Sequence, residues 1–199
     1  MADPKNPPII TAAYIRRHVW PAVVIALILI ATAIELHRQG RLWSCSCPNF
    51  LWTSNAWSSQ TSQLFLDPYS FTHVLHGFLF FWLITWLAPR LNSNWQLMLA
   101  VAVESLWEVF ENTSFIIDRY RSETAALGYQ GDTVVNSFGD IFCCLVGFMI
   151  ARRLGLRWSF IVFAGLELVL IVWIRDSLLL EILMLVFPID AIKALQMCH

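Results

Sequence analysis

Glutamate and histidine side chains recur at helical spacing within apolar stretches of this chain. Glu104, Glu108 and Glu111 fall within an arc of about 60° on a helix, and His73 and His76 share one helix face. Imidazole and carboxylate groups together can bind a divalent cation or exchange protons with a substrate. We therefore expect a cation-binding or acid–base site, with hydrogen bonding between helices as the simpler alternative.

A second polar series, formed by Asp132, Asn136 and Asp140, has i, i+4, i+8 spacing at the start of a later apolar stretch. Asp132 is suited to capping that helix, but capping does not explain Asp140, which lies two turns further in. Counting about 1.5 Å per residue from the outer end of each span brings His76, Glu108, Glu111, Asp140 and Glu167 to a similar depth, in the outer half of a bilayer. The residues expected to line a shared polar pocket are His73, His76, Glu104, Glu108, Glu111, Asn112, Asp132, Asn136 and Asp140.

The residue types in this pocket predict separate roles. The catalytic candidates are Glu108, Glu111, Asn136 and Asp140. The metal-ligand candidates are His73, His76, Glu108 and Glu111, a set that suits a divalent metal. The sequence contains no phosphate-binding loop, dinucleotide fingerprint, HExxH or GxSxG motif, so no residue is assigned to an organic cofactor.

The composition indicates where such a pocket would lie. The chain has 199 residues, of which 58% are hydrophobic and only 14% charged. Soluble domains carry about 25% charged residues, so the composition of this chain excludes an ordinary soluble domain. The net charge of −1 also excludes a nucleic-acid binder, which would need a basic excess. We therefore expect the lipid bilayer as the surroundings and no nucleic acid as a partner.

Apolar stretches long enough to cross a bilayer, which takes about 20 residues, define the expected architecture. The predicted spans cover residues 19–36, 71–88, 95–117, 134–151 and 158–174. Residues 177–189 form a short sixth span, a re-entrant segment or an interfacial helix. The prediction is one all-α domain over residues 1–199, a polytopic bundle of five or six transmembrane helices with an outer loop at 37–70.

The distribution of Lys and Arg predicts the orientation. With the N-terminus in the cytoplasm, eight basic residues lie inside and five outside. The inner set is Lys5, Arg16, Arg17, Arg90, Arg152, Arg153, Arg157 and Lys193. The expected location is the bacterial inner membrane, with the pocket in its periplasmic half. The alternative, a cleaved signal peptide ending near Ala31 to Ala33, requires a shorter apolar run.

Acidic and basic residues are divided unequally between the predicted spans and the remainder. Seven of the fourteen acids lie within the spans, and none of the thirteen Lys and Arg does. A charge at the centre of a membrane helix costs roughly 2.5–3.5 kcal/mol on insertion scales. Residues 95–117 carry three of these acids, so this helix is expected inside the bundle. Protons, a metal or a partner protein must neutralise them.

Two further groups of residues lie outside the spans. Arg119, Arg121 and Arg175 could bind a phosphate or lipid head group, or serve only as interfacial anchors. Cys45 and Cys47 are separated by one residue, and a disulfide across that spacing is strained. They are interpreted either as a soft-metal or redox pair or as two thiols without a function.

Three segments carry a resemblance: HGFLFFWLITWLAPR, ESLWEVFENTSFIIDRYR and GYQGDTVVNSFGDIFCCLVGF. They resemble an alphaproteobacterial inner-membrane family catalogued as a domain of unknown function, from about His73 to about Pro188. The resemblance implies a multi-pass topology and an inner-membrane location. It assigns no activity.

Three functions are compatible with the sequence. The first is a metal-dependent or acid–base enzyme for a lipid-like substrate, with Glu108 as the base. The second is a proton or metal transporter, for which Glu104 is the residue best placed to connect the two sides. The third is a structural or assembly subunit, whose acids would pair with the basic residues of a membrane-protein partner.

Overall fold

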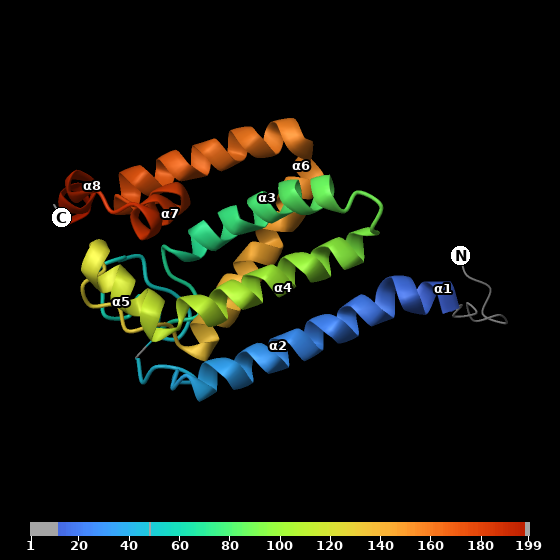
Figure 1. Cartoon of the computed structure of the whole chain (residues 1–199), viewed down its shortest axis with the longest axis horizontal. Helices are drawn as coiled ribbons and strands as arrows, with labels where there is room; N and C mark the ends of the chain where they lie inside the picture. The colour runs from blue at the N-terminus through green and yellow to red at the C-terminus, as the bar shows by residue number, and fades with distance from the viewer. Residues whose placement is uncertain (1–11, 48, 198–199) are drawn as a thin grey trace.

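The computed structural model describes residues 12–47 and 49–197, and over these residues the chain is all-helical, as predicted, with no strand. The helices are α1 (Ala12–Tyr14), the π-helix η1 (Ile15–Val19), α2 (Trp20–Arg38), α3 (Ser70–Leu87), α4 (Ser93–Glu111), α5 (Ser114–Glu123), α6 (Val134–Ile174), α7 (Leu178–Val186) and α8 (Asp190–Met197). Figure 1 shows α2, α3, α4 and both parts of α6 forming the bundle.

Three helices within the described ranges are long and apolar enough to cross a membrane: Ile15–Arg38, Ser70–Leu87 and Val134–Ile174. The first two match the predicted spans 19–36 and 71–88. The third contains two predicted spans, 134–151 and 158–174, because α6 is continuous apart from a non-helical break at Gly155. Gly155 has φ 72°, a left-handed value that favours glycine. Beyond this break the helix turns back along the bundle (Figure 1).

The predicted span 95–117 is longer than the helix that forms there. The helix α4 ends at Glu111, Asn112 is its C-cap, and α5 begins separately at Ser114. The helix α4 is not among the described helices that are long and apolar enough to span. The side chain of Asn92 caps the N-terminus of α4 by accepting hydrogen bonds from the backbone of Asn94 and Trp95.

Within residues 177–189, where a sixth span was one possibility, the structure forms only a short helix, α7. With nine residues, α7 is about 14 Å long, whereas the hydrocarbon core is about 30 Å thick. The next helix, α8, stays at the same end of the bundle, where Lys193 donates to the backbone carbonyl of Ser122 at α5. Figure 1 shows α7 and α8 at the same end of the bundle as α5.

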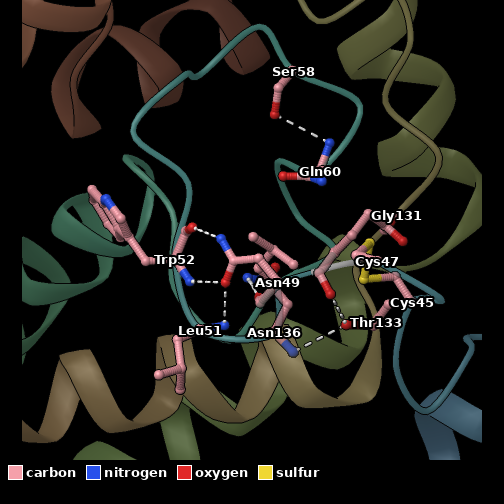
Figure 2. Close-up of a disulfide and its surroundings, with 12 residues drawn as sticks. Cys45, Cys47, Asn49, Leu51, Trp52, Ser58, Gln60, Gly131, Thr133 and Asn136 are labelled. Atoms are coloured by element: carbon pink, nitrogen blue, oxygen red, sulfur yellow. Dashed lines mark hydrogen bonds between the residues drawn. A yellow bond between two sulfur atoms is a disulfide. The ribbon is translucent and has the colours of Figure 1, made fainter.

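The connection between α2 and α3 forms a cover over the start of α6. Backbone N–H groups of Thr133, Val134 and Val135 donate to the carbonyls of Ser62, Leu42 and Trp43. Within this loop Cys45 and Cys47 form a disulfide, so they are not the two free thiols that one interpretation assumed. Figure 2 shows this disulfide beside Gly131 and Thr133, directly above the first turn of α6.

Two glycines allow α3 and α6 to approach closely. A Cβ atom at Gly77 would overlap the backbone of Cys144 and Phe148, and one at Gly147 would overlap the backbone of Val74. This reciprocal contact sets the distance between the two helices that carry the histidines and Asp140.

Candidate functional site

A buried carboxylate contacts both histidines of α3. Nδ1 of His73 lies 2.6 Å from Oε1 of Glu104, and Nδ1 of His76 lies 3.0 Å from Oε2 of the same residue. Glu104 has no exposed surface. Because an ionised carboxylate only accepts hydrogen bonds, the Nδ1 atoms donate to it, and in the neutral form of each ring Nε2 then carries no proton.

Glu108 is also fully buried, one helical turn further along α4. Neither of its carboxylate oxygens accepts a hydrogen bond from any residue that the structure describes. Its Oε1 lies 3.4 Å from Nδ1 of His73, the atom that already donates to Glu104. An unsatisfied buried carboxylate is costly and points to a function.

Asp140 of α6 completes the group on the opposite side of His73. Its Oδ2 lies 3.9 Å from Nε2 of His73. Its Oδ1 accepts a 2.9 Å hydrogen bond from the hydroxyl of Ser70 at the start of α3. Three helices therefore bring together His73, His76, Glu104, Glu108 and Asp140, as their spacing predicted.

Asn112 and Asp132 pair with each other next to this group. The Asn112 amide donates to Oδ2 of Asp132 over 2.8 Å, and the Asp132 backbone donates back to Oδ1 of Asn112 over 2.7 Å. Tyr129 donates a third hydrogen bond to Asp132. Burial raises the pKa of Asp132, although the bonds from Asn112 and Tyr129 oppose the shift.

The N-cap of α6 is Thr133, and not Asp132 as expected, because the Thr133 side chain accepts the bond from Asn136. Asn136, a catalytic candidate, donates its side-chain amide to the carbonyl of Leu64 over 2.8 Å. Its observed contact therefore holds the covering loop.

A cavity of about 1340 Å³ lies between the covering loop, α5 and α7. The histidines, Glu111, Asp132, Asn136 and Asp140 line it. A further wall is apolar and comes from α3 and α4, with Leu79, Phe80, Val103, Leu106 and Trp107. Val103 and Leu106 are 42% and 69% exposed on the outside of the protein, so this wall is also part of the bundle surface.

Asp67 and Arg41 line this cavity although the sequence did not single them out. Asp67 is buried and accepts hydrogen bonds from the backbone of Ser62 and Tyr69. Burial raises its pKa, and these two bonds lower it. Arg41 donates to the carbonyl of Gln130. Both lie in irregular backbone, where periodicity gives no signal; the Asp-Pro pair before α3 is the one local cue.

Of the three arginines that could bind a head group, two have other contacts. Arg119 donates to the carbonyl of Leu185 over 2.9 Å, and Arg121 donates to that of Tyr129 over 2.5 Å. Arg175 follows α6 with a left-handed backbone. None of the three belongs to the described lining of the cavity.

Three combinations of described side chains place their ligand atoms within 4.8 Å of one another, close enough for a metal ion. They are His73 with His76 and Glu104, His73 with Glu108 and Asp140, and Glu108 with Glu111 and Asp132. The predicted ligands His73, His76, Glu108 and Glu111 are thus divided among three overlapping groups.

Comparison with known proteins gives a family. The family described as "Protein of unknown function (DUF2585)" matches residues 36–198. A UPF0314 protein of Brucella anthropi is 37% identical over 175 residues, 88% of this chain and 89% of that one. UPF0314 proteins of Paracoccus denitrificans and Rhizobium meliloti are each 40% identical, covering 85% and 91% of this chain and 89% and 92% of theirs.

No solved structure matches the chain. The relatives come from alphaproteobacteria, in agreement with the resemblance seen in the sequence, and the match extends well beyond the segments from His73 to Pro188. The chain belongs to the DUF2585 (UPF0314) family of alphaproteobacterial proteins of unknown function.

Proposed function

We propose that this protein is a membrane enzyme that acts on a lipid-like amphiphile by acid–base chemistry at the buried histidine and carboxylate cluster. The observation that carries the proposal is the make-up of the 1340 Å³ cavity, which has titratable side chains at one side and an apolar wall at another. A ligand pocket that is mainly apolar with a few convergent polar groups is typical of binding and active sites.

The apolar wall supports an amphiphilic substrate. Val103 and Leu106 belong both to the cavity and to the exposed surface between α3 and α4. In a bilayer this surface would face lipid, so an acyl chain could lie along it while the head group reaches His73 and Asp140.

Glu108 supports acid–base chemistry because its buried oxygens have no hydrogen-bond donor among the described residues. Glu108 does not belong to the described lining of the cavity, whereas His73 does, and Nδ1 of His73 lies 3.4 Å from Oε1 of Glu108. Through this histidine the carboxylate would accept the proton that a substrate hydroxyl or water gives up. Glu104 would act as a positioning residue, since it holds Nδ1 of both histidines.

The other two functions have less support. Buried acids among the described residues are Asp67, Glu104, Glu108, Asp132, Asp140 and Glu167, and the first half of α4 contributes none. A transporter would need such groups toward both ends. In a subunit whose acids pair with a partner, Glu104 would not already be paired with His73 and His76.

We further propose five membrane spans, a cytoplasmic N-terminus and an inner-membrane location. Lys193 lies with α5 at the cavity end, and therefore on the periplasmic side in this topology. The count of basic residues then becomes seven on the cytoplasmic side and six on the periplasmic side, in place of eight and five. The disulfide between Cys45 and Cys47 gives separate support, because disulfides persist in the oxidising periplasm and are rare in the cytoplasm. Both are consistent with a cavity that opens on the periplasmic side.

Lipid occupancy tests the binding half of this proposal. Native mass spectrometry of wild-type protein released from nanodiscs should show bound lipid, and Val103→Trp, which adds bulk to the cavity wall, should lower its occupancy. Val172→Trp is the matched control, because Val172 is 84% exposed on α6 and does not belong to the described cavity lining. Equal occupancy in all three proteins would contradict the proposal.

A further inference from the structure

We propose that Nε2 of His73, one oxygen of Glu108 and Oδ2 of Asp140 bind a divalent transition-metal ion. This inference deepens the proposed function and rests on it, because the ion would lie where the head group is expected. The ligand set differs from the predicted one: Asp140 enters it, while His76 and Glu111 leave it.

The unsatisfied carboxylate of Glu108 carries this inference. It is 0% exposed, and its oxygens have no hydrogen-bond partner in the described part of the chain. A bare carboxylate in such a place must be protonated or meet a cation. Two carboxylates and one neutral imidazole carry a charge of −2, which a divalent cation neutralises within the apolar bundle.

The ligand atoms of the three residues already lie near one another, and side-chain rotations would bring them to metal-binding spacing. Ligand atoms of the three residues lie within 4.8 Å of one another, and Nε2 of His73 lies 3.9 Å from Oδ2 of Asp140. In a tetrahedral site with bonds of about 2.1 Å, neighbouring ligand atoms are about 3.4 Å apart. Oε1 of Glu108 lies 3.4 Å from Nδ1 of His73, on the other side of the ring from Nε2. Closing the site therefore requires side-chain rotations that bring the ligand atoms together by up to about 1.4 Å, from 4.8 Å to the tetrahedral spacing.

Surrounding hydrogen bonds fix two of the three ligands in place. Glu104 accepts from Nδ1 of His73 at 2.6 Å, which directs Nε2 toward Asp140. Ser70 donates to the other oxygen of Asp140 at 2.9 Å. Metal-binding histidines almost always donate their second N–H to a carboxylate or carbonyl in this way. The pairing of Glu104 with His73 is thus accounted for by the site.

The donor set selects the class of ion. One imidazole and two carboxylates suit Zn²⁺, Mn²⁺ or Fe²⁺ better than soft ions that prefer thiolates. Binding through one oxygen leaves the second oxygen of Glu108 free. That oxygen would accept the proton of a hydroxyl or water brought to the ion, so the metal and the acid–base role use the same residue.

Metal titration tests the inference directly. Chelator-treated protein in detergent is titrated with Zn²⁺ and with Mn²⁺, and bound metal is measured by elemental analysis after gel filtration. The wild type should bind one equivalent, while Glu108→Gln and Asp140→Asn should lose binding by at least about tenfold. Glu104→Gln should weaken it by about 10–100-fold, as loss of an outer-shell partner does. Glu167→Gln, a buried acid outside the group, should retain one equivalent.

The wild type alone also decides the question, even where a variant fails to fold. An ion that binds the folded state raises the thermal midpoint by mass action. Absence of both stoichiometric metal and a midpoint shift in the wild type would overturn the site, as would full binding by well-folded Glu108→Gln and Asp140→Asn. Lipid occupancy is measured without added metal, so its outcome distinguishes failure of this site from failure of the proposed function.

Discussion

Nδ1 of His73 lies 2.6 Å from Oε1 of Glu104, a residue with no exposed surface. Glu104 holds His76 as well, so one carboxylate orients two imidazoles on the neighbouring helix. It also joins α4 to α3 through polar contacts within an otherwise apolar bundle. This relationship explains how the carboxylate of Glu104 is accommodated within the bundle.

Replacement of Glu104 by alanine should destabilise the protein. It leaves two buried N–H donors without an acceptor, at a cost of about 1–3 kcal/mol. The thermal midpoint in detergent should fall clearly for Glu104→Ala. The control is Glu35→Ala, because Glu35 pairs with Arg38 at the surface, with 40% and 74% of the two side chains exposed. A change there should stay within about 0.5 kcal/mol. Similar midpoints for both variants would show that Glu104 is not structural.

The glycine contact between α3 and α6 gives a second prediction. In Gly147→Ala the new methyl group would overlap the backbone of Val74, and such overpacking costs typically about 1–3 kcal/mol. Gly165→Ala lies in the same helix with no atom within 4 Å of the new Cβ. It should be neutral or gain up to about 1 kcal/mol from helix propensity. The thermal midpoints of the two variants test this difference, and equal midpoints would argue against the close helix contact.

Much of the helical framework could be predicted from the sequence, because apolar length and period depend on local composition. Helical periodicity also predicted which face of α3 carries His73 and which face of α4 carries Glu104 and Glu108, and these two faces meet in the structure. The separation of α5 from α4 was not predicted, because a criterion of apolar length passes over the polar run Asn112 to Ser114, where α4 ends and α5 begins. The return of α8 to α5 depends on a long-range contact of Lys193 with Ser122.

The cavity was less predictable than the cluster within it. Asp67 and Arg41 lie in loops whose path depends on contacts with α6 and with the 124–133 segment. Arg119 and Arg121 have the residue type for binding a head group, but their side chains turn toward backbone carbonyls. Residue type and spacing define a helix face, whereas the path of a loop and the partner that a long arginine side chain finds are tertiary properties.

A third prediction concerns pH. Asp176 lies between α6 and α7, and burial raises its pKa from 3.8 to about 7. Between these values the folded protein holds a proton that the unfolded chain releases, so stability should fall as pH rises through this window. Above pH 7 this contribution is constant. Asp176→Asn should make the thermal midpoint depend less steeply on pH between 4 and 7, and an unchanged slope would contradict the raised pKa.

A fourth prediction concerns topology. Five spans and a cytoplasmic N-terminus put the C-terminus in the periplasm, where alkaline phosphatase folds and green fluorescent protein does not. A C-terminal phosphatase fusion should therefore be active and a C-terminal fluorescent fusion dark. Fusions within the Arg152 and Arg153 region of α6 should give the reverse pattern. A fluorescent C-terminal fusion with an inactive phosphatase counterpart would exclude this arrangement.

The central claim is that Glu108 takes part in chemistry on a membrane lipid, and lipid analysis of whole membranes tests it most directly. Membranes from a deletion strain complemented with the wild type are compared with those complemented with Glu108→Gln or with Glu167→Gln, at equal protein levels. We predict that Glu108→Gln reproduces the lipid profile of the deletion strain, with one amphiphile accumulating and its product depleted, while Glu167→Gln matches the wild type. Identical lipid profiles in the deletion, wild-type and Glu108→Gln strains would contradict the account.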